Sequence, residues 1–203
     1  MQKLLEDINN DFFLDNDSSA IERMIANRLI DKEAINKKWL GYLPANEKQI
    51  ALKEKLLGVT LPSSYKKFFR ISNGFRFISF FLDNLLPIDK IDWTVNSLEK
   101  STLSMFEYLE DEITEQCFYH EADKRLNELI LTKNEHFIKS IRIADWYDGM
   151  CVFLNPAVRY GDEWEILVYA NWDPVTRHYR SFEEFLKWTH KENLEILKDQ
   201  NRI

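Results

Sequence analysis

The spacing of apolar residues predicts helices toward both ends of the chain and strands between them. Stretches in which apolar residues recur three and four positions apart are typical of helices. They cover residues 19–29, 32–40, 46–57, 61–74 and 181–197. Short apolar runs bounded by turn-forming residues predict strands. They cover residues 75–81, 85–88, 141–144, 150–154 and 164–170.

The run LPSSYKKFFRISNG, residues 61–74, is the most completely specified of these elements. Pro62 fixes φ where a helix can begin, and the hydroxyls of Ser63 and Ser64 are expected to accept hydrogen bonds from the first amides. Asn73-Gly74 is expected to end the helix, because both residue types tolerate the left-handed conformation. The run contains no nucleophile beside a base, so it predicts a structural helix.

Local signals set the ends of several other elements. Capping boxes, in which Ser is followed three residues later by Glu, predict helix starts at Ser19 and Ser181. Asp148-Gly149 and Gly161-Asp162 predict turns, and Asn155-Pro156 is expected to break the strand before it. Helices therefore come first, then hairpin-linked strands, then a helix. This order favours an α+β fold with an antiparallel sheet over a parallel one.

The same elements divide the chain into two predicted parts. Residues 1–38 are expected to form an N-terminal helical extension, and residues 39–203 the main domain. The chain has 203 residues and is 45% hydrophobic, which is enough for one sizeable core.

Charge and composition limit the partners and the location. The formal net charge is −7, and an acidic chain repels phosphate backbones, so we expect no nucleic acid partner. The N-terminus lacks the apolar core of a signal peptide, and no stretch approaches the roughly 20 uninterrupted apolar residues of a membrane span. We therefore expect a cytoplasmic protein with no membrane partner, in which Cys117 and Cys151 are reduced thiols.

Motifs for catalysis, metal binding or cofactor binding are not evident. The four histidines have no metal-ligand spacing, and each is expected to be a surface or partly buried residue. Nucleophile-elbow and glycine-rich phosphate motifs are missing from a chain with only five glycines. We therefore expect no enzymatic activity, no metal and no cofactor.

The stretch from residue 97 to 135 carries most of the negative charge. It contains ten acidic and four basic residues, so its net charge of −6 nearly equals that of the whole chain. The pattern of residues 97–139 is helical but irregular. Such a run is either a solvated helical face or an acidic docking surface for a basic partner, and the sequence leaves both open.

Several motifs occur in one order along the chain. The first is the helix, LG…LP link, helix and NG of residues 43–74, after which Lys90-Ile-Asp-Trp93 follows a Leu-Pro pair. The others are DG…VFLNP at 148–156, EWE…YANWDP at 163–174 and HYRSFEEF at 178–185. Together they make residues 43–190 resemble the SUKH superfamily, also called the SMI/KNR-like proteins.

The resemblance implies a compact α+β domain with a curved antiparallel sheet packed against helices, and a function by binding. Many bacterial members of this superfamily are immunity proteins that neutralise a toxin delivered between competing cells. Fungal relatives regulate cell-wall synthesis through protein contacts. No catalytic residues are known as a family property. We therefore expect an immunity protein that binds a cognate toxin, often a nuclease and so a basic protein.

The candidate partner-binding residues follow from charge and from position at the predicted hairpin ends. They are Glu110, Asp111, Glu112, Glu115, Asp148, Asp162, Trp172 and Asp173. Two alternatives stay open at this point. One is a regulatory scaffold that binds an endogenous protein. The other is a small hydrolase that uses an acid pair such as Asp145 with Asp148, or Asp162 with Glu163.

Overall fold

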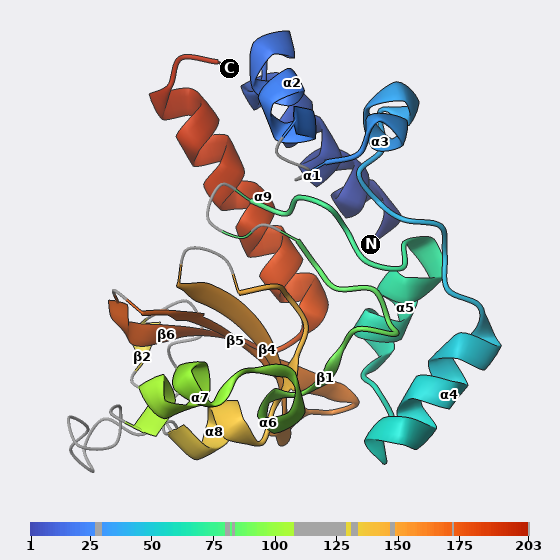
Figure 1. Cartoon of the computed structure of the whole chain (residues 1–203), viewed down its shortest axis with the longest axis vertical. Helices are drawn as coiled ribbons and strands as arrows, with labels where there is room; N and C mark the ends of the chain where they lie inside the picture. The colour runs from blue at the N-terminus through green and yellow to red at the C-terminus, as the bar shows by residue number, and fades with distance from the viewer. Residues whose placement is uncertain are drawn as a thin grey trace.

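One antiparallel sheet forms the centre of the protein (Figure 1). The computed structural model describes residues 1–26, 30–79, 82, 84–107, 129–130, 134–146, 149–171 and 173–202. Within these residues the sheet has six strands in the order β1-β3-β4-β5-β6-β2. The strands are β1 Asp92–Trp93, β2 Leu129–Ile130, β3 Ile141–Arg142, β4 Met150–Tyr160, β5 Glu163–Ala170 and β6 Asp173–Tyr179. The long β4–β5 hairpin lies at its middle.

Helices cover both faces of this sheet. They are α1 Gln2–Asp15, α2 Ser18–Ala26, α3 Lys32–Lys37, α4 Glu47–Leu57, α5 Ser63–Ile71, α6 Thr94–Ser97, α7 Lys100–Glu107, α8 Asn134–Ile138 and α9 Phe182–Asp199. Figure 1 shows α9 across one face, with α5 and α1 beside it, and α7 and α8 on the other face. The predicted α+β fold, an antiparallel sheet packed against helices with a helical N-terminal region, is confirmed.

Alternate residues of β4 enter two different cores. Met150, Val152 and Leu154 belong to the main core, beneath α5 and α9. Cys151 and Phe153 face the other way, into a smaller cluster that includes aromatic side chains from α7 and α8. Because side chains alternate along a strand, a strand buried on both faces reads as a continuous apolar run. This burial explains why the run at 150–154 was recognisable.

The break predicted at Asn155-Pro156 is wrong, because β4 continues to Tyr160. Pairing with β5 shifts register between Asn155 and Arg159, so the proline lies in a β-bulge. The Asn155 side chain supports this bulge, since its Oδ1 accepts a hydrogen bond of 3.1 Å from the Ala157 amide. The bulge interrupts the pairing with β5 without ending β4.

Two other strand predictions need correction. Residues 75–81 and 85–88 form no strands where the structure describes them. Isolated bridges join Phe75 to Gly41 and to Leu85, and Leu85 to Ala144. Conversely, β6 was not predicted, because polar residues interrupt its sequence, DPVTRHY. It is specified by pairing with β5, in which Val168 lies opposite Arg177.

Helix α5 begins with a cap from a distant part of the chain. The expectation that Ser63 and Ser64 accept hydrogen bonds from the first amides is wrong. Both hydroxyls donate instead to the carboxylate of Glu163, with Ser63 Oγ 2.7 Å from Oε1. The Ser64 amide also donates to Oε1, over 2.8 Å. A carboxylate at a helix N-terminus accepts hydrogen bonds from the unpaired amides, and its negative charge interacts favourably with the positive end of the helix dipole. Glu163 therefore fixes α5 to the first residue of β5.

The other end of α5 also differs from the expectation. The helix ends at Ile71, and Ser72 is already extended, so Asn73-Gly74 is not its immediate cap. Gly74 does have a positive φ of 96°. A Cβ there would lie 2.8 Å from the Leu85 carbonyl oxygen, so close backbone approach requires glycine.

The two predicted capping boxes have different outcomes. The box at Ser19 is wrong, because Asp17 Oδ1 accepts from the Ala20 amide at 2.8 Å and α2 begins at residue 18. At the second site, Ser181 Oγ accepts from the Glu184 amide at 3.1 Å and α9 begins as predicted, but the Glu184 carboxylate accepts from the Arg180 amide at 2.7 Å and not from that of Ser181. At both helix starts, a side-chain oxygen accepts a hydrogen bond from the amide three residues later; Asp17 provides it for α2 and Ser181 for α9.

The N-terminal region shares the main core. Leu5, Ile8 and Phe12 of α1 are fully buried in it, and α1 contacts α9. Asp11 Oδ2 lies 2.7 Å from His190 Nδ1 of α9, and burial raises the pKa of the Asp11 carboxyl. The boundary between residues 1–38 and 39–203 stays a prediction, but α1 is packed against the rest of the protein.

Removal of the Glu163 carboxylate is expected to lower the free energy of unfolding by about 1–2 kcal/mol, the usual loss for a helix cap. Glu163→Ala removes all three hydrogen bonds, whereas Glu163→Gln keeps one acceptor oxygen and should lose less. Urea denaturation followed by circular dichroism measures both. Asp162→Ala, in the adjacent exposed turn, is the matched control and should change stability by less than about 0.5 kcal/mol. Equal stability of Glu163→Ala and the wild type would contradict the capping role.

Candidate functional site

Most of the predicted partner-binding residues lie outside the described part of the chain. These are Glu110, Asp111, Glu112, Glu115, Asp148 and Trp172. Asp162 is described and exposed, in the turn between β4 and β5. Asp173 is the first residue of β6, where its backbone pairs with Ala170.

The structure separates Asp162 from Asp173. Asp162 precedes the first residue of β5, and Asp173 pairs with the last. At roughly 3.3 Å per strand residue, the length of β5 places the two about 23 Å apart. Asp162 and Asp173 therefore lie at opposite ends of the central strands and do not form one compact cluster.

A buried polar network crosses the middle strands, and sequence reasoning missed it. Glu165 of β5 receives a hydrogen bond of 2.9 Å from Asn155 Nδ2 of β4, and its other oxygen lies 2.8 Å from His178 Nδ1 of β6. Asn155 Nδ2 is also 3.1 Å from His136 Nδ1 of α8. All but His136 have no exposed surface. The expectation that every histidine is at the surface or partly buried is therefore wrong for His178.

This network joins strands and is closed to solvent. Asn155, Glu165 and His178 come from three adjacent strands, so their contacts hold those strands in one register. A substrate cannot reach a side chain with no exposed surface, which makes the Glu165–His178 pair unsuited to acid–base chemistry in this conformation. The signal in the sequence was that all three residues lie in the motifs LNP, EWE and HYRSF.

The described groups that could serve catalysis have structural partners. Asp145 Oδ2 accepts a hydrogen bond of 2.8 Å from Asn84 Nδ2, and its Oδ1 is 3.3 Å from Arg142 Nη1. Glu163 caps α5. One described member of each proposed acid pair is thus already engaged. Within the described residues, no three His, Cys, Asp or Glu side chains gather as metal ligands would.

The surroundings of Cys151 make its thiol a poor nucleophile. Its side chain is fully buried, with Sγ 3.4 Å from the Ala144 carbonyl oxygen. Burial raises its pKa to about 12, because the charged thiolate is poorly solvated. At neutral pH the nucleophilic thiolate is therefore scarce.

An open groove of about 400 Å³ lies between α3, the segment 39–44 and the end of α5. Trp39, Tyr42 and Leu43 line it, and Leu43 is 81% exposed. Arg76 closes its floor: Nη1 donates to the carbonyls of Leu40 and Gly41 over 3.0 and 2.9 Å, and the guanidinium lies 3.8 Å from the Tyr42 ring centroid. The groove offers an apolar and aromatic surface to a partner.

These features define a helix-covered α+β domain in which the described motif residues Asn155, Glu163, Glu165 and His178 hold the fold together. The model of the SMI1 / KNR4 family (SUKH-1) matches residues 44–188. The chain belongs to this family, as its motifs predicted. Comparison with curated proteins finds no match to the chain. No helix in the described residues has the length and apolar character needed to cross a bilayer.

His178→Leu is expected to lower the free energy of unfolding by about 3 kcal/mol, because it removes the histidine from Glu165 Oε1 and leaves the buried carboxylate with Asn155 on its other oxygen. The double variant Glu165→Leu/His178→Leu removes both members and should be more stable than the single variant. Urea denaturation of the two variants and the wild type gives the comparison. A double variant that is no more stable than His178→Leu would show that the pair is not the source of the loss.

The Cys151 thiol is expected to resist modification while the protein is folded. In a Cys117→Ser variant, Cys151 is the single thiol of the chain. With its pKa near 12, about 10⁻⁴ of it is thiolate at pH 8, so Ellman's reagent should react only slowly. Unfolding in guanidinium chloride should release one reactive thiol per chain. Rapid, complete reaction of the folded variant would contradict the buried placement.

Proposed function

We propose that this protein is a cytoplasmic immunity protein that binds and neutralises a cognate bacterial toxin by protein–protein contact. The observation that carries this proposal is membership of the SMI1 / KNR4 (SUKH-1) family over residues 44–188. Immunity proteins are a main functional class in the superfamily that these motifs resemble.

The placement of the described polar groups supports binding as the mode of action. The Glu165–His178 pair is sealed in the sheet, Glu163 caps a helix, and the Cys151 thiol is buried. A protein that inhibits by contact needs a stable fold and a complementary surface, and it needs none of these groups to be reactive. This arrangement therefore suits an inhibitor better than a hydrolase.

The charge of the chain supports a basic toxin as the partner. The net charge is −7, and the ten acids and four bases of residues 97–135 account for −6 of it. A nuclease must be basic where it holds phosphates, and an acidic inhibitor that covers such a surface associates fast. We assign the contact to Glu110, Asp111, Glu112 and Glu115, with Asp148, Asp162, Trp172 and Asp173 as candidates at the strand ends.

Co-expression with the product of the adjacent gene tests the proposal. We expect the wild-type protein to restore growth of cells that make the toxin, and to bind the purified toxin in isothermal titration calorimetry. The triple variant Glu110→Lys/Asp111→Lys/Glu115→Lys should bind at least about 100-fold more weakly, because close interfacial charge pairs are worth several kcal/mol and like charges repel. Its association rate should fall most at low salt.

A control with the same change in charge separates a local contact from a general effect. Glu22→Lys/Glu195→Lys/Asp199→Lys reverses three exposed acids on α2 and α9. It should protect cells as well as the wild type does. Absence of protection and of binding by the wild-type protein would refute the proposal. Capture of a housekeeping protein in place of a toxin would favour the regulatory scaffold.

A further inference from the structure

Helix α4 is held firmly at its N-terminal end. The Asn46 side chain accepts from the Gln49 amide at 3.0 Å, and the Gln49 side chain accepts from the Asn46 amide at 2.8 Å, which completes a capping box. Glu47 binds the guanidinium of Arg70 on α5 through both oxygens, over 2.6 and 3.1 Å. These contacts fix the position of the first turn against α5.

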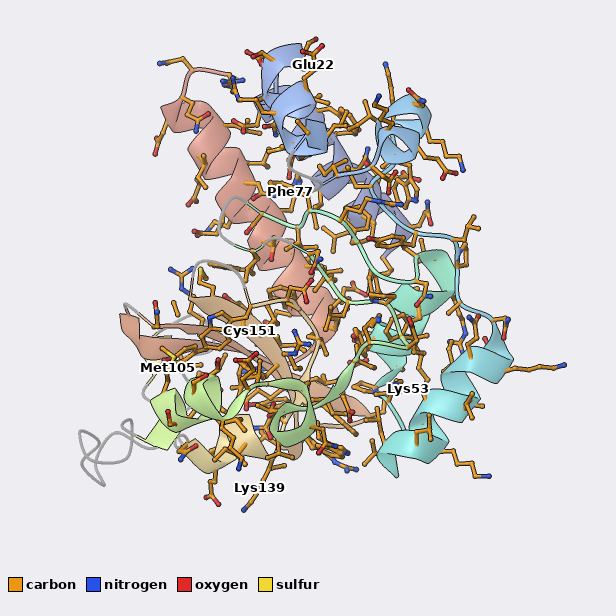
Figure 2. The ribbon with its side chains drawn as sticks, in the orientation of Figure 1. Glu22, Lys53, Phe77, Met105, Lys139 and Cys151 are labelled. Atoms are coloured by element: carbon orange, nitrogen blue, oxygen red, sulfur yellow. The ribbon has the colours of Figure 1, made fainter. Side chains whose placement is uncertain are left out.

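The middle and the C-terminal end of α4 are fixed as well. Glu54 accepts from the Leu61 amide at 2.8 Å and is paired with Lys66 at 3.2 Å. Lys53 donates to the carbonyls of Asp89 and Ile91 over 3.1 and 2.9 Å, and Figure 2 shows Lys53 on the side of α4 that faces the rest of the molecule. The Leu57 carbonyl, at the last residue, accepts from the Trp93 indole at 3.2 Å.

The opposite face of α4 carries side chains that these contacts do not use. Leu52 and Leu56 are 58% and 70% exposed, far more than core leucines. Lys48 and Lys55 are also exposed, and neither forms an ion pair within the described residues. Positions 48, 52, 55 and 56 are separated in turn by four, three and one residues, and at about 100° per residue they fall within about 100° of the helix circumference, on one face. Figure 1 shows α4 at the edge of the molecule.

A groove of about 160 Å³ runs beside the two leucines. Gln49, Leu52, Lys53 and Leu56 form one wall, and Ile88 with Asp89 forms the other. Its walls are fixed, because Lys53 bonds the backbone of the loop that carries Asp89. The face therefore combines a preformed apolar groove with two lysines that lack carboxylate partners in the described residues.

We infer that this face of α4, defined by Lys48, Leu52, Lys55 and Leu56, is a docking surface for an acidic amphipathic helix of a partner protein. An apolar side chain of that helix enters the groove between the leucines and the 88–89 loop. Its carboxylates pair with Lys48 and Lys55. The two lysines favour a partner helix with negative charge, and the groove favours one with apolar side chains.

A lipid surface fits these observations less well. The groove is a concave feature that one apolar side chain can fill, whereas the surface of a bilayer would leave it unfilled. This inference does not rest on the proposed toxin contact, which uses the acidic residues and requires a partner of the opposite charge.

The test uses a fluorescein-labelled synthetic helical peptide with leucines three and four residues apart and glutamates on its flanks. A second peptide carries lysine in place of every glutamate. Fluorescence anisotropy with the full chain is expected to show binding of the acidic peptide with a Kd below about 1 mM and no binding of the basic one. Raising the salt concentration should weaken binding, since exposed charge pairs are screened.

Matched variants locate the contact. Leu52→Ala/Leu56→Ala removes the apolar groups at constant charge, and Lys48→Glu/Lys55→Glu reverses the charge at constant apolar surface. Each double variant should bind the acidic peptide at least tenfold more weakly, and the charge-reversed variant should bind the basic peptide. Leu43→Ala, which shortens an 81% exposed leucine elsewhere, should leave the Kd unchanged. All of these side chains are exposed, and urea denaturation confirms that each variant is folded.

Four outcomes would overturn the inference. The first is that the acidic peptide fails to bind, and the second is that both double variants bind it as the wild type does. The third is binding of phosphatidylserine vesicles that depends on Leu52 and Leu56 while the peptide fails, which would assign the face to a lipid surface. The fourth is a dimer in analytical ultracentrifugation that Leu52→Ala/Leu56→Ala abolishes, which would assign it to a second copy of the chain.

Discussion

The contact between Glu163 and the N-terminus of α5 is the constraint on which the rest of the fold depends. It ties the first residue of β5 to a helix about 100 residues earlier in the chain. With α5 fixed there, Phe68 lies with its ring centroid 5.0 Å from that of Phe182, at the start of α9. Helix α9 in turn supports α1 through the Asp11–His190 pair. The carboxylate is thus the first link in a series of contacts that runs from β5 through α5 and α9 to α1.

Several residues of the family motifs hold parts of the fold together. The LP…NG segment and the EWE segment meet at Glu163, and the LNP, EWE and HYRSF segments meet at the buried Asn155–Glu165–His178 network. Buried polar groups that satisfy one another specify a single register, because a slipped strand would leave them unpaired in an apolar interior. Of the proposed partner contacts, Glu110, Asp111, Glu112 and Glu115 lie outside these motifs, where charge can differ without loss of these buried contacts.

Local signals predicted the elements that depend on local chemistry. Asn46 and Gly58 delimit α4 as their residue types indicate, and Ser181 caps α9. Prediction failed where a distant partner decided the outcome. Glu163, and not Ser63 or Ser64, caps α5. Pro156 lies in a bulge of β4 and does not end the strand, and β6 forms by pairing with β5. The candidate site followed from charge in the sequence, but the groove beside α4 and the exposure of Leu52 and Leu56 depend on tertiary packing that no local pattern records.

The two proposed surfaces differ in the physical term that drives them. The acidic segment has a large net charge of −6, which acts over about a Debye length of 10 Å and so favours the rate of encounter. The α4 face has only two unpaired lysines within the described residues, but it is apolar and rigid. A helix that is already held in place loses less entropy on binding, so such a face contributes mainly to the lifetime of a complex. A protein with both surfaces can attract a basic partner from a distance through one and hold an acidic helix through the other. Because the required charges are opposite, neither partner competes for the other's surface.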